Sequence, residues 1–477
     1  MELHLEQQQI SSFVLQAKRH AEERFSSDCV VPDTLPDAAN LLLTEGELCL
    51  WRLDLAEGSA ELEGEIAARV TFRTEAGEPF GFPVSIPVSV RFRGEELQSG
   101  LRPYLSCRVA ELTGQLLNSR KVRLQGRLAC ELTLYTPKDL ALTTGIDAEE
   151  KSVFLRRDRM TVSVVSAVEE QVFSVSETIP LRLGFPAEGR ILSHSSVPVL
   201  EETQILNRRL ILQGRVVTTL LYLDAQRAEL VSETIETPFS QLADTASDEP
   251  ISTADTAVHL TSVELRCRND DQAVETEFHL VAQTVCFSSV ESDCVIDAYS
   301  ANGSLSLSWA SEPLPAIPAQ LCRETVDGVL SCNPSGKSIC AARSALRGDR
   351  VEITLLLQGG EEGLSVLTGQ LALPEGAQCP VLSEAPAAAP CPEGFAVHVP
   401  VAFREAAALP EPLRQISGAS LEQSEDADDR PSVKLVLRTD TDLWTVAKTH
   451  ASSEEAIRAA NPETDPPSRW LLIPRVI

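Results

Sequence analysis

Apolar and polar residues alternate over long stretches of this chain. The segments Asn118 to Tyr135, Met160 to Ile179 and Val274 to Phe287 place apolar side chains at about every second position. A strand sends successive side chains to opposite faces, so this alternation predicts strands with one face in a core and the other in water. The sequence therefore predicts a mainly β chain built from antiparallel strands.

One unit recurs within this pattern. Leu62-Glu63-Gly64-Glu65-Ile66 opens an alternating run that ends at Ile86-Pro87-Val88-Ser89. Leu212-Gln213-Gly214-Arg215-Val216 opens a similar run that ends at Thr237-Pro238-Phe239-Ser240. The copies lie roughly 150 residues apart, which is typical of a duplicated structural unit. We interpret the two glycines as sites of β-bulges or close strand approach, and Pro87 and Pro238 as strand ends.

A weaker third copy follows. It runs from Gly348 through the alternating residues Val351 to Leu357, reaches Leu371 to Pro374, and has a later strand from Phe395 to Phe403. We interpret this copy as degenerate. Together the copies predict serial antiparallel β-sandwich-like or partly closed barrel modules. The first segment, Ser12 to Phe25, fits a short amphipathic helix by its spacing, whereas its flanks favour extended structure.

The pattern changes near the C-terminus. Residues 409–432 are polar and acidic and have no apolar periodicity, which predicts a solvated linker. Its acidic residues are Glu422, Glu425, Asp426, Asp428 and Asp429.

A small β-α-α-β arrangement is predicted beyond this linker. Val433 to Leu437 alternates as a strand, Asp442 to Thr449 and Ser453 to Ala460 predict two short helices, and Trp470 to Ile473 predicts a closing strand. Ser452 and Ser453 are placed to cap the second helix, with two glutamates in its first turn.

These patterns predict five regions. Residues 1–140 form a first β module with an N-terminal segment, and 141–310 form a second module. Residues 311–408 form the degenerate third module, 409–432 the acidic linker, and 433–477 the small C-terminal domain.

Composition restricts the partners and the location. Lys and Arg total 41 against 70 Asp and Glu, a formal net charge of -29, which repels nucleic acid and anionic lipid surfaces. The N-terminus lacks a basic stretch followed by an apolar run, and no segment approaches the ~20 uninterrupted apolar residues of a spanning helix. We therefore expect a cytoplasmic protein without membrane insertion.

The 12 cysteines are scattered. Three of them, Cys322, Cys332 and Cys340, lie closer together but lack CxxC spacing, which argues against a metal site or a disulfide. Several others lie within apolar runs, where we expect reduced core thiols. These are Cys49, Cys107, Cys130, Cys267 and Cys286.

Catalytic signatures are missing from the sequence. His259, His279 and His398 lie in strand-like stretches without a paired ligand at helical or hairpin spacing. Residues 333–338 contain Gly-Lys-Ser, but the first glycine of a phosphate-binding loop is missing at the required position. We therefore expect no enzyme activity, no catalytic residue, no metal and no cofactor.

The C-terminal region resembles the LysM domain, a β-α-α-β module. The matching segments are Asp442 to Lys448, Glu455-Ala456-Ile457, Asn461-Pro462 and Leu472-Ile473-Pro474. The resemblance implies a groove for a protein or an N-acetylated glycan between two loops. Its residues would be Asp440, Thr441, Asp442, Leu443 and Trp444 on one side and Asn461, Pro462, Glu463 and Thr464 on the other.

The first side of this groove departs from the family pattern. The usual Gly-Asp-Thr becomes Asp440-Thr441-Asp442, so a permissive glycine is lost and an acid is added. A side chain in place of glycine obstructs the backbone groups that grip sugars. The departure favours a protein partner over a glycan.

The remainder of the chain resembles the SPOCS-domain proteins, which are associated with spore coats and often end in a LysM domain. The features that carry this resemblance are Val31 to Asp37, the Leu-x-Gly strands ending in a Pro-x-Ser turn, and Asn118 to Val122. We interpret Pro32 to Asp37 as a tight turn before a short helix, in which an Asp caps exposed amides.

Three hypotheses follow for the function. The leading one is a scaffold of spore-coat morphogenesis, which docks through its LysM domain to a protein of the coat or the forespore surface, in the mother-cell cytosol. The alternative is a protein that binds peptidoglycan or N-acetylglucosamine glycans through the same groove. The third is an enzyme with an unrecognised site among the β modules.

Overall fold

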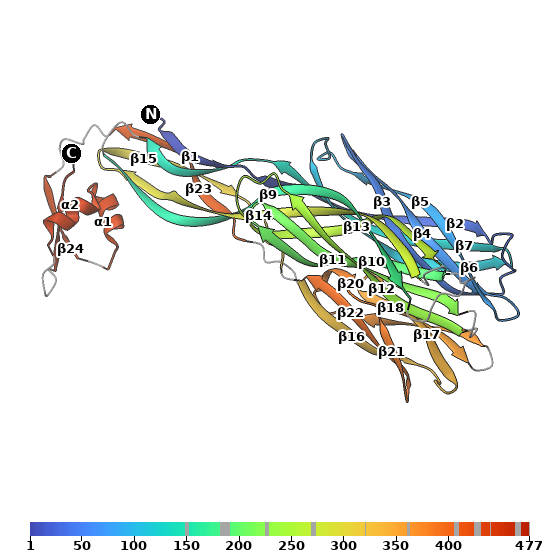
Figure 1. Cartoon of the computed structure of the whole chain (residues 1–477). Helices are drawn as coiled ribbons and strands as arrows, with labels where there is room; N and C mark the ends of the chain where they lie inside the picture. Colours follow the sequence, from blue (N-terminus) through green and yellow to red (C-terminus); the bar gives the residue numbers. More distant parts are fainter. Residues whose placement is uncertain are drawn as a thin grey trace.

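A computed structural model describes most of the chain. The described residues are 1–147, 152–181, 191–224, 229–268, 273–319, 321–359, 363–404, 410–423, 431–438, 440–462 and 469–476. These ranges are mainly β, arranged in several antiparallel sheets with two short α-helices near the C-terminus, so the predicted mainly β class is confirmed. The molecule is elongated, and the helices lie at one end of it (Figure 1).

The largest sheet contains nine strands of the described residues, in the order β5-β4-β3-β13-β14-β9-β2-β7-β6. Two of its junctions are single residue pairs, Leu260 with Cys49 and Phe13 with Val165, so three groups of three strands meet in it. The strands are β2 (Phe13–Val30), β3 (Asn40–Ala56), β4 (Ser59–Arg73), β5 (Pro79–Arg93), β6 (Arg102–Asn118), β7 (Lys121–Pro137), β9 (Val153–Pro180), β13 (Ile251–Arg268) and β14 (Ala273–Ser300).

The other strands of the described residues form smaller sheets. Two sheets have three strands each, and a third sheet is centred on β22, which pairs with three neighbours. Their strands are β10 (Ile191–Leu206), β11 (Arg209–Asp224) and β12 (Glu229–Asp244); β17 (Lys337–Arg347), β18 (Arg350–Gly359) and β19 (Leu364–Ala372); and β16 (Leu321–Ser331), β20 (Gln378–Leu382), β21 (Ala387–Cys391) and β22 (Gly394–Arg404).

Three further strand pairs complete this description. They are β1 (His4–Ile10) with β8 (Leu140–Asp147), β15 (Gly303–Glu312) with β23 (Leu413–Gln423), and β24 (Val433–Leu437) with β25 (Trp470–Pro474). The helices α1 (Leu443–His450) and α2 (Glu454–Ala460) lie between β24 and β25 in sequence.

The sequence repeats correspond to a repeated arrangement of strands. The copies give three antiparallel meanders, β3-β4-β5, β10-β11-β12 and β17-β18-β19. Each meander shares a buried core with a second group of strands, β2-β7-β6, β9-β14-β13 and β16-β22-β20 respectively. We call these strand sets unit 1 (β2–β7), unit 2 (β9–β14) and unit 3 (β16–β22). The units lie within the predicted modules, whose domain boundaries stay predictions.

The two repeat glycines lie where neighbouring strands approach closely. A Cβ atom on Gly64 would lie 2.4 Å from the carbonyl oxygen of Cys49, and one on Gly214 would lie 2.3 Å from that of Val199. The neighbouring strand has a register shift beside each glycine. A side chain does not fit there, so the interpretation of a bulge and close approach is confirmed.

The repeat prolines are not at strand ends, and that interpretation is wrong. Pro87 pairs with Glu65 in the middle of β5, and Pro238 pairs with Arg215 in the middle of β12. Both strands lie at the edge of their sheets. An edge strand leaves alternate N–H groups outside the ladder, so a residue without an N–H is tolerated there.

The turn after β2 encloses an arginine from the segment Asn118 to Val122. The guanidinium of Arg120 donates hydrogen bonds to the backbone oxygens of Val31, Pro32 and Leu35 at 2.7 to 2.9 Å. It also lies 3.4 Å from the carboxylate of Asp37. The predicted short helix is wrong, because the turn leads into β3 and its carbonyls are satisfied by the arginine.

Extended structure also decides one open alternative and replaces one other expectation. The segment Ser12 to Phe25 falls largely in β2 and is extended, as its flanks indicated. The interpretation of 409–432 as a linker is wrong for the residues of β23, where Leu413, Ile416 and Leu421 are buried. A register shift between Ile416 and Gly418 changes the phase of the alternation, which hid this strand in the sequence.

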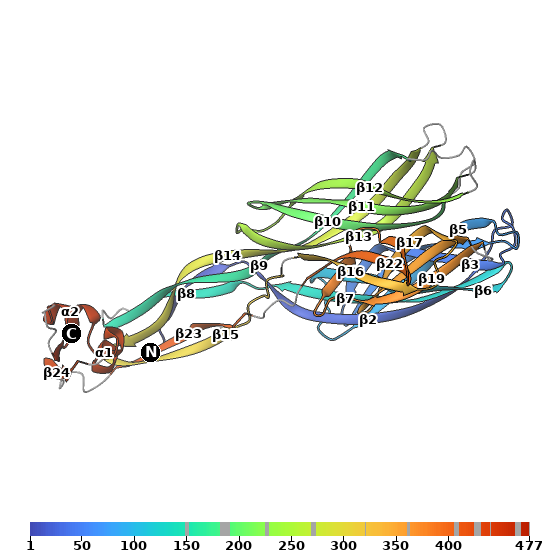
Figure 2. The same cartoon turned by 90° about the horizontal axis from the view of Figure 1, so that it is seen from below.

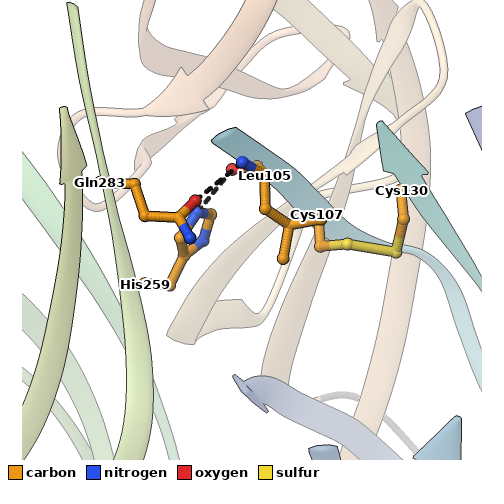
Figure 3. The surroundings of a disulfide bond; sticks show 5 residues. All are labelled: Leu105, Cys107, Cys130, His259 and Gln283. Atoms are coloured by element: carbon orange, nitrogen blue, oxygen red, sulfur yellow. Dashed lines mark hydrogen bonds between the residues drawn. A yellow bond between two sulfur atoms is a disulfide. The ribbon is translucent and has the colours of Figure 1, made fainter. Parts of the chain in front are cut away.

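One pair of cysteines contradicts the expectation of reduced thiols. Cys107 of β6 and Cys130 of β7 lie directly opposite each other, with Cα atoms 4.2 Å apart, and form a disulfide (Figure 3). Cross-strand pairing brought them together, and no local sequence signal indicated the pairing. Cys49 and Cys286 are free and buried, and burial raises the pKa of each thiol to about 12.

A buried ionic cluster joins the three units. Glu45 of unit 1 lies 2.6 Å from the guanidinium of Arg343 in unit 3, and both side chains are more than nine-tenths buried. Glu47 of unit 1 accepts a 2.6 Å hydrogen bond from the backbone N–H of Ser196 in unit 2 and lies 3.4 Å from the ring of His194. Buried charges require such partners, so this cluster fixes the units relative to each other.

Candidate functional site

The C-terminal residues form a small module around their own core. Strands β24 and β25 pair antiparallel over their whole length, from Val433 with Pro474 to Leu437 with Trp470. Both helices pack on one face of this pair, where Ile457 and Ile473 are buried. We call the described part of residues 431–476 the C-terminal module.

Side chains cap both helices of this module. Asp442 is the N-cap of α1 and accepts a 3.3 Å hydrogen bond from the backbone N–H of Thr445. Ser453 is the N-cap of α2 and accepts a 3.1 Å hydrogen bond from the N–H of Ala456, as predicted. Ser452 has another role, because its hydroxyl donates to the backbone oxygen of Pro474 at 2.5 Å.

Helix α1 contacts unit 2 through hydrogen bonds to one aspartate, Asp297. The indole N–H of Trp444 donates to Asp297 of β14 at 2.8 Å, and the ammonium of Lys448 donates to both oxygens of the same carboxylate at 2.6 and 2.8 Å. Partial burial raises the pKa of Asp297, but these hydrogen bonds outweigh it and hold the pKa below its usual value.

Aromatic rings surround this contact. The rings of Tyr299 and Trp444 meet edge to face with centroids 4.9 Å apart, and Phe154 stacks on Tyr299 at 5.3 Å. The hydroxyl of Tyr299 donates to the backbone oxygen of Ser452 at 2.8 Å. Burial raises the pKa of Tyr299 to about 12. The aromatic cluster buries most of the Trp444 side chain against unit 2.

An ion pair adds a second polar contact to unit 2. The carboxylate of Asp442 lies 3.0 Å from the guanidinium of Arg156 in β9. Hydrogen bonding from Thr445, helped by the charge of Arg156, lowers the pKa of Asp442. Both side chains are about half exposed, so this pair orients the module more than it stabilises it.

A groove opens between α1 and β24, with a volume of about 300 Å³. Thr441 and Leu443, two of the predicted site residues, line it. The other lining residues are Val436, Leu437, Arg438, Thr445, Val446, Thr449, His450 and Leu471.

The predicted second side of the site has a structural role where it is described. The side-chain amide of Asn461 donates to the backbone oxygen of Leu472 at 2.6 Å and accepts from the N–H of Leu472 at 2.8 Å. Pro462 and Asp440 are exposed. Glu463 and Thr464 lie outside the described residues.

The predicted site residues therefore lie in three different environments. Asp442 and Trp444 face unit 2, Thr441 and Leu443 border the groove, and Asn461 holds β25. The sequence did not identify Arg156, Asp297 and Tyr299, the residues of unit 2 that contact the C-terminal module. Nothing in their local pattern distinguishes them from other residues of a half-buried strand.

The histidines singled out in the sequence are satisfied by neighbours. The ring Nε2–H of His259 donates to the backbone oxygen of Leu105 at 2.8 Å, beside the Gln283 side chain that accepts from the N–H of Leu105 at 2.7 Å (Figure 3). Burial lowers the pKa of His259. His279 and His398 are exposed and lie within 3.5 Å of carboxylates.

The described residues contain no group of three or more His, Cys, Asp or Glu side chains arranged to hold a metal ion. Neither described helix has the length and apolar character needed to cross a membrane. No protein-family model matches this chain, and no curated protein matches it.

Proposed function

We propose that this protein is a non-enzymatic scaffold of spore-envelope assembly. Its three β-sandwich-like units set a fixed spacing, and a LysM-like C-terminal domain docks a protein partner of the coat or the forespore surface. The observation that carries the proposal is the open groove of about 300 Å³ beside α1, on a module that α1 also fastens to unit 2.

The arrangement of contacts supports docking on the groove side. Asp442 and Trp444 are engaged with unit 2, so the surface left for a partner is the one bordered by Thr441 and Leu443. Its lining mixes apolar side chains with threonines, Arg438 and His450, which suits a side chain or short segment of a protein.

The rigid connection between units supports a spacer role. The Glu45–Arg343 pair and the contacts of Glu47 with unit 2 join the three units away from the C-terminal module. Acids and a histidine cluster there, but they are buried between units and paired, whereas an enzyme site would need them to line an accessible cleft. We place this work in the mother-cell cytosol, at the forespore surface.

Removing residues 433–477 tests the proposal. In sporulating cells the full chain, labelled at its N-terminus, should collect at the forespore, and the shortened chain should be diffuse. The disulfide and the units should persist in the shortened chain, which circular dichroism of the purified protein checks. Normal recruitment of a folded shortened chain would exclude this module as the docking site.

Glycan binding is the second candidate, because the groove volume falls within the range of small-molecule sites. Calorimetry of the full chain with N-acetylglucosamine oligomers distinguishes the two functions. Heat released at millimolar oligomer, and lost when Leu443 is replaced by Asp, would favour the glycan. Absence of heat at millimolar oligomer would remove the glycan as the ligand of this groove.

A further inference from the structure

Unit 3 has two strands with an unpaired edge on the same side. Among the described residues β16 pairs only with β22, and β19 pairs only with β18. The two strands face each other across the core, because Leu371 of β19 lies against Gly328 of β16 and Leu330 of β16 lies against Gly369 of β19. We call the side formed by β16 and β19 the open side of unit 3.

The opposite side of unit 3 faces the rest of the molecule. There β17 lies beside β20 and β21. Arg343 of β17 contacts Glu45 of unit 1 and donates a 3.1 Å hydrogen bond to the hydroxyl of Ser232 in unit 2. Unit 3 lies along the lower side of the molecule in Figure 1 and in front of unit 1 in Figure 2. Most of the open side is therefore turned away from units 1 and 2.

The open side lacks a protection that the matching edges of units 1 and 2 have. The edge strands β5 and β12 of the first two meanders contain Pro87 and Pro238. The matching strand of the third meander is β19, which contains no proline and no Asp, Glu, Lys or Arg. Proline and charge are common means by which an edge strand avoids pairing with another chain. Their absence from β19 favours a partner on this side.

Strand β16 is complementary to itself in one antiparallel register. Its pairing with β22 has no register shift, so its odd-numbered residues share the outer face of the sheet, and all of them are exposed. With Thr325 opposite its own copy, Leu321 lies opposite Val329. In the same register Arg323 lies opposite Asp327. Apolar, Thr–Thr and opposite-charge pairs are the cross-strand pairs that stabilise antiparallel strands.

The neighbouring registers do not give this agreement. A two-fold axis at Arg323 places two guanidinium groups opposite each other, and an axis at Asp327 places two carboxylates opposite each other. Like charges directly opposite each other are destabilising. An axis at Glu324 or Val326 leaves both of these charged residues opposite uncharged side chains. The charge pattern of β16 therefore favours a second copy of the chain, in one register, as the partner.

The contacts that these charged residues make within the chain are compatible with this pairing. Arg323 donates a 3.4 Å hydrogen bond to the backbone oxygen of Glu201, which uses one of the five N–H groups of the guanidinium. Asp327 lies 2.6 Å from the ring of His398, and its side chain is 65 % exposed. Glu324 opposes the pairing, because its two copies would be diagonal neighbours about 7–8 Å apart.

We propose that two copies of the chain pair through the open side of unit 3, with the β16 strands antiparallel about a two-fold axis at Thr325. The two sheets would join into one, and each strand would satisfy the edge backbone groups of the other. An 11-residue strand is smaller than the roughly 20–30 residues per side of a standard interface, so the dimer should be weak and depend on concentration. The pairing involves neither the groove nor the C-terminal module.

Sedimentation velocity of the full chain at increasing concentration tests the proposal. The unchanged protein should shift from monomer to dimer. Arg323→Asp brings two pairs of carboxylates together, and Asp327→Arg brings two pairs of guanidinium groups together, so each should weaken the dimer roughly tenfold or more. Arg209→Asp is the matched control, because Arg209 forms an exposed cross-strand pair with Asp244 in unit 2 and its replacement should leave the dimer unchanged.

Recombining the charges tests the register. The double variant Arg323→Asp, Asp327→Arg has opposite charges facing each other again and should recover the dimer. A mixture of the two single variants should form a heterodimer for the same reason. An extended segment of another protein bound to β16 would show neither effect. Circular dichroism confirms the fold of each variant.

A cross-link locates the axis. Thr325→Cys should form a disulfide-linked dimer under mild oxidation, because directly opposite residues of antiparallel strands have Cα atoms about 4.5–5.5 Å apart. Ser331→Cys is the control on the same face of β16, since its two copies would lie about 40 Å apart along the strands. The unchanged protein, oxidised alongside, gives the background from the native cysteines.

Three results would overturn the proposal. One is a chain that sediments as a monomer at every concentration. Another is a dimer that both single charge variants form as readily as the unchanged protein. The third is loss of the dimer in the single variants without recovery in the double variant or in the mixture, which would show that β16 does not pair with its own copy.

Discussion

The indole of Trp444 and the carboxylate of Asp297 are 147 residues apart in sequence and are joined by a 2.8 Å hydrogen bond. Lys448, one helical turn later, binds the same carboxylate. The residue that the LysM resemblance places at the binding groove is thus used to fix the C-terminal module on unit 2. The other side of α1 is left to border the open groove.

Loss of the shared carboxylate should loosen the module. In Asp297→Ala, Trp444 and Lys448 lose their acceptor, and we expect a cost of about 1–3 kcal/mol in the closing of the module on unit 2. Hydrogen exchange of the α1 amides measures this opening. Asp54→Ala removes the partner of the exposed Arg52 and should leave α1 unchanged, so equal effects of both variants would contradict the assignment.

The contact of Asp297 with Trp444 and Lys448 should weaken at acidic pH. The pKa of Asp297 is lowered in the folded protein from 3.8, so the unfolded state binds more protons at low pH. Its contribution to stability is complete above pH ~4, where both states are ionised, and is lost as the pH falls through the lowered pKa. The fluorescence of Trp444 can be obtained as the difference between the unchanged protein and Trp444→Phe. During an acid titration this difference should change as the contact with Asp297 is lost. Asp297→Asn should remove this change; a change that persists would assign it to other carboxylates.

Tyr299 should matter through its hydroxyl as well as its ring. Tyr299→Phe leaves the backbone oxygen of Ser452 without this donor and should cost about 1 kcal/mol in denaturant unfolding. Because the pKa of Tyr299 is raised to about 12, its contribution is complete below pH ~10 and is lost as the pH rises through 12. An unchanged alkaline transition in Tyr299→Phe would refute this role.

The buried pair between units 1 and 3 should be costly to break. Arg343→Met leaves the Glu45 carboxylate buried without its cation, and we expect a loss of about 3–5 kcal/mol in chemical denaturation. Arg52→Met, at an exposed pair, should cost under about 1 kcal/mol. Combining Arg343→Met with Glu45→Gln should recover part of the loss. Equal costs for the two single variants would show that the units are not joined here.

The disulfide should stabilise unit 1. Cys107 and Cys130 lie 23 positions apart in sequence, and opening a loop of this length costs about 3 kcal/mol in the chain-entropy account. The melting temperature with and without reductant measures the effect. A double Cys107→Ser, Cys130→Ser variant should melt like the reduced protein and be insensitive to reductant. A reductant effect that survives in this variant would point to other cysteines.

The strands were predictable because their cause is local. Alternation in Val274 to Ala282 follows from one face being buried and the other partly exposed, and Gly214 marks a place where the adjacent strand leaves no room for a Cβ atom. Alternation fails wherever a bulge inserts a residue. The shift between Ile416 and Gly418 gives β23 an irregular spacing of apolar residues, and this spacing predicts a linker in place of a strand.

The contacts of the candidate site were not predictable, because they join distant segments. Arg156 and Asp297 are ordinary charged residues of a strand until α1 lies against them. The same holds for Cys107 and Cys130, which only strand register brings together. Helix capping by Asp442 and Ser453 is local, and the cap at Ser453 was visible in the sequence.

The most direct test of the proposed scaffold function is to block the groove and leave the C-terminal module attached to unit 2. Thr449 is exposed on α1 and lines the groove, whereas Ala459 is exposed on α2 outside it. In sporulating cells, labelled Thr449→Arg should lose its recruitment to the forespore surface, and labelled Ala459→Arg should keep it. Recruitment of Thr449→Arg at the level of the unchanged protein would contradict docking of a partner in this groove.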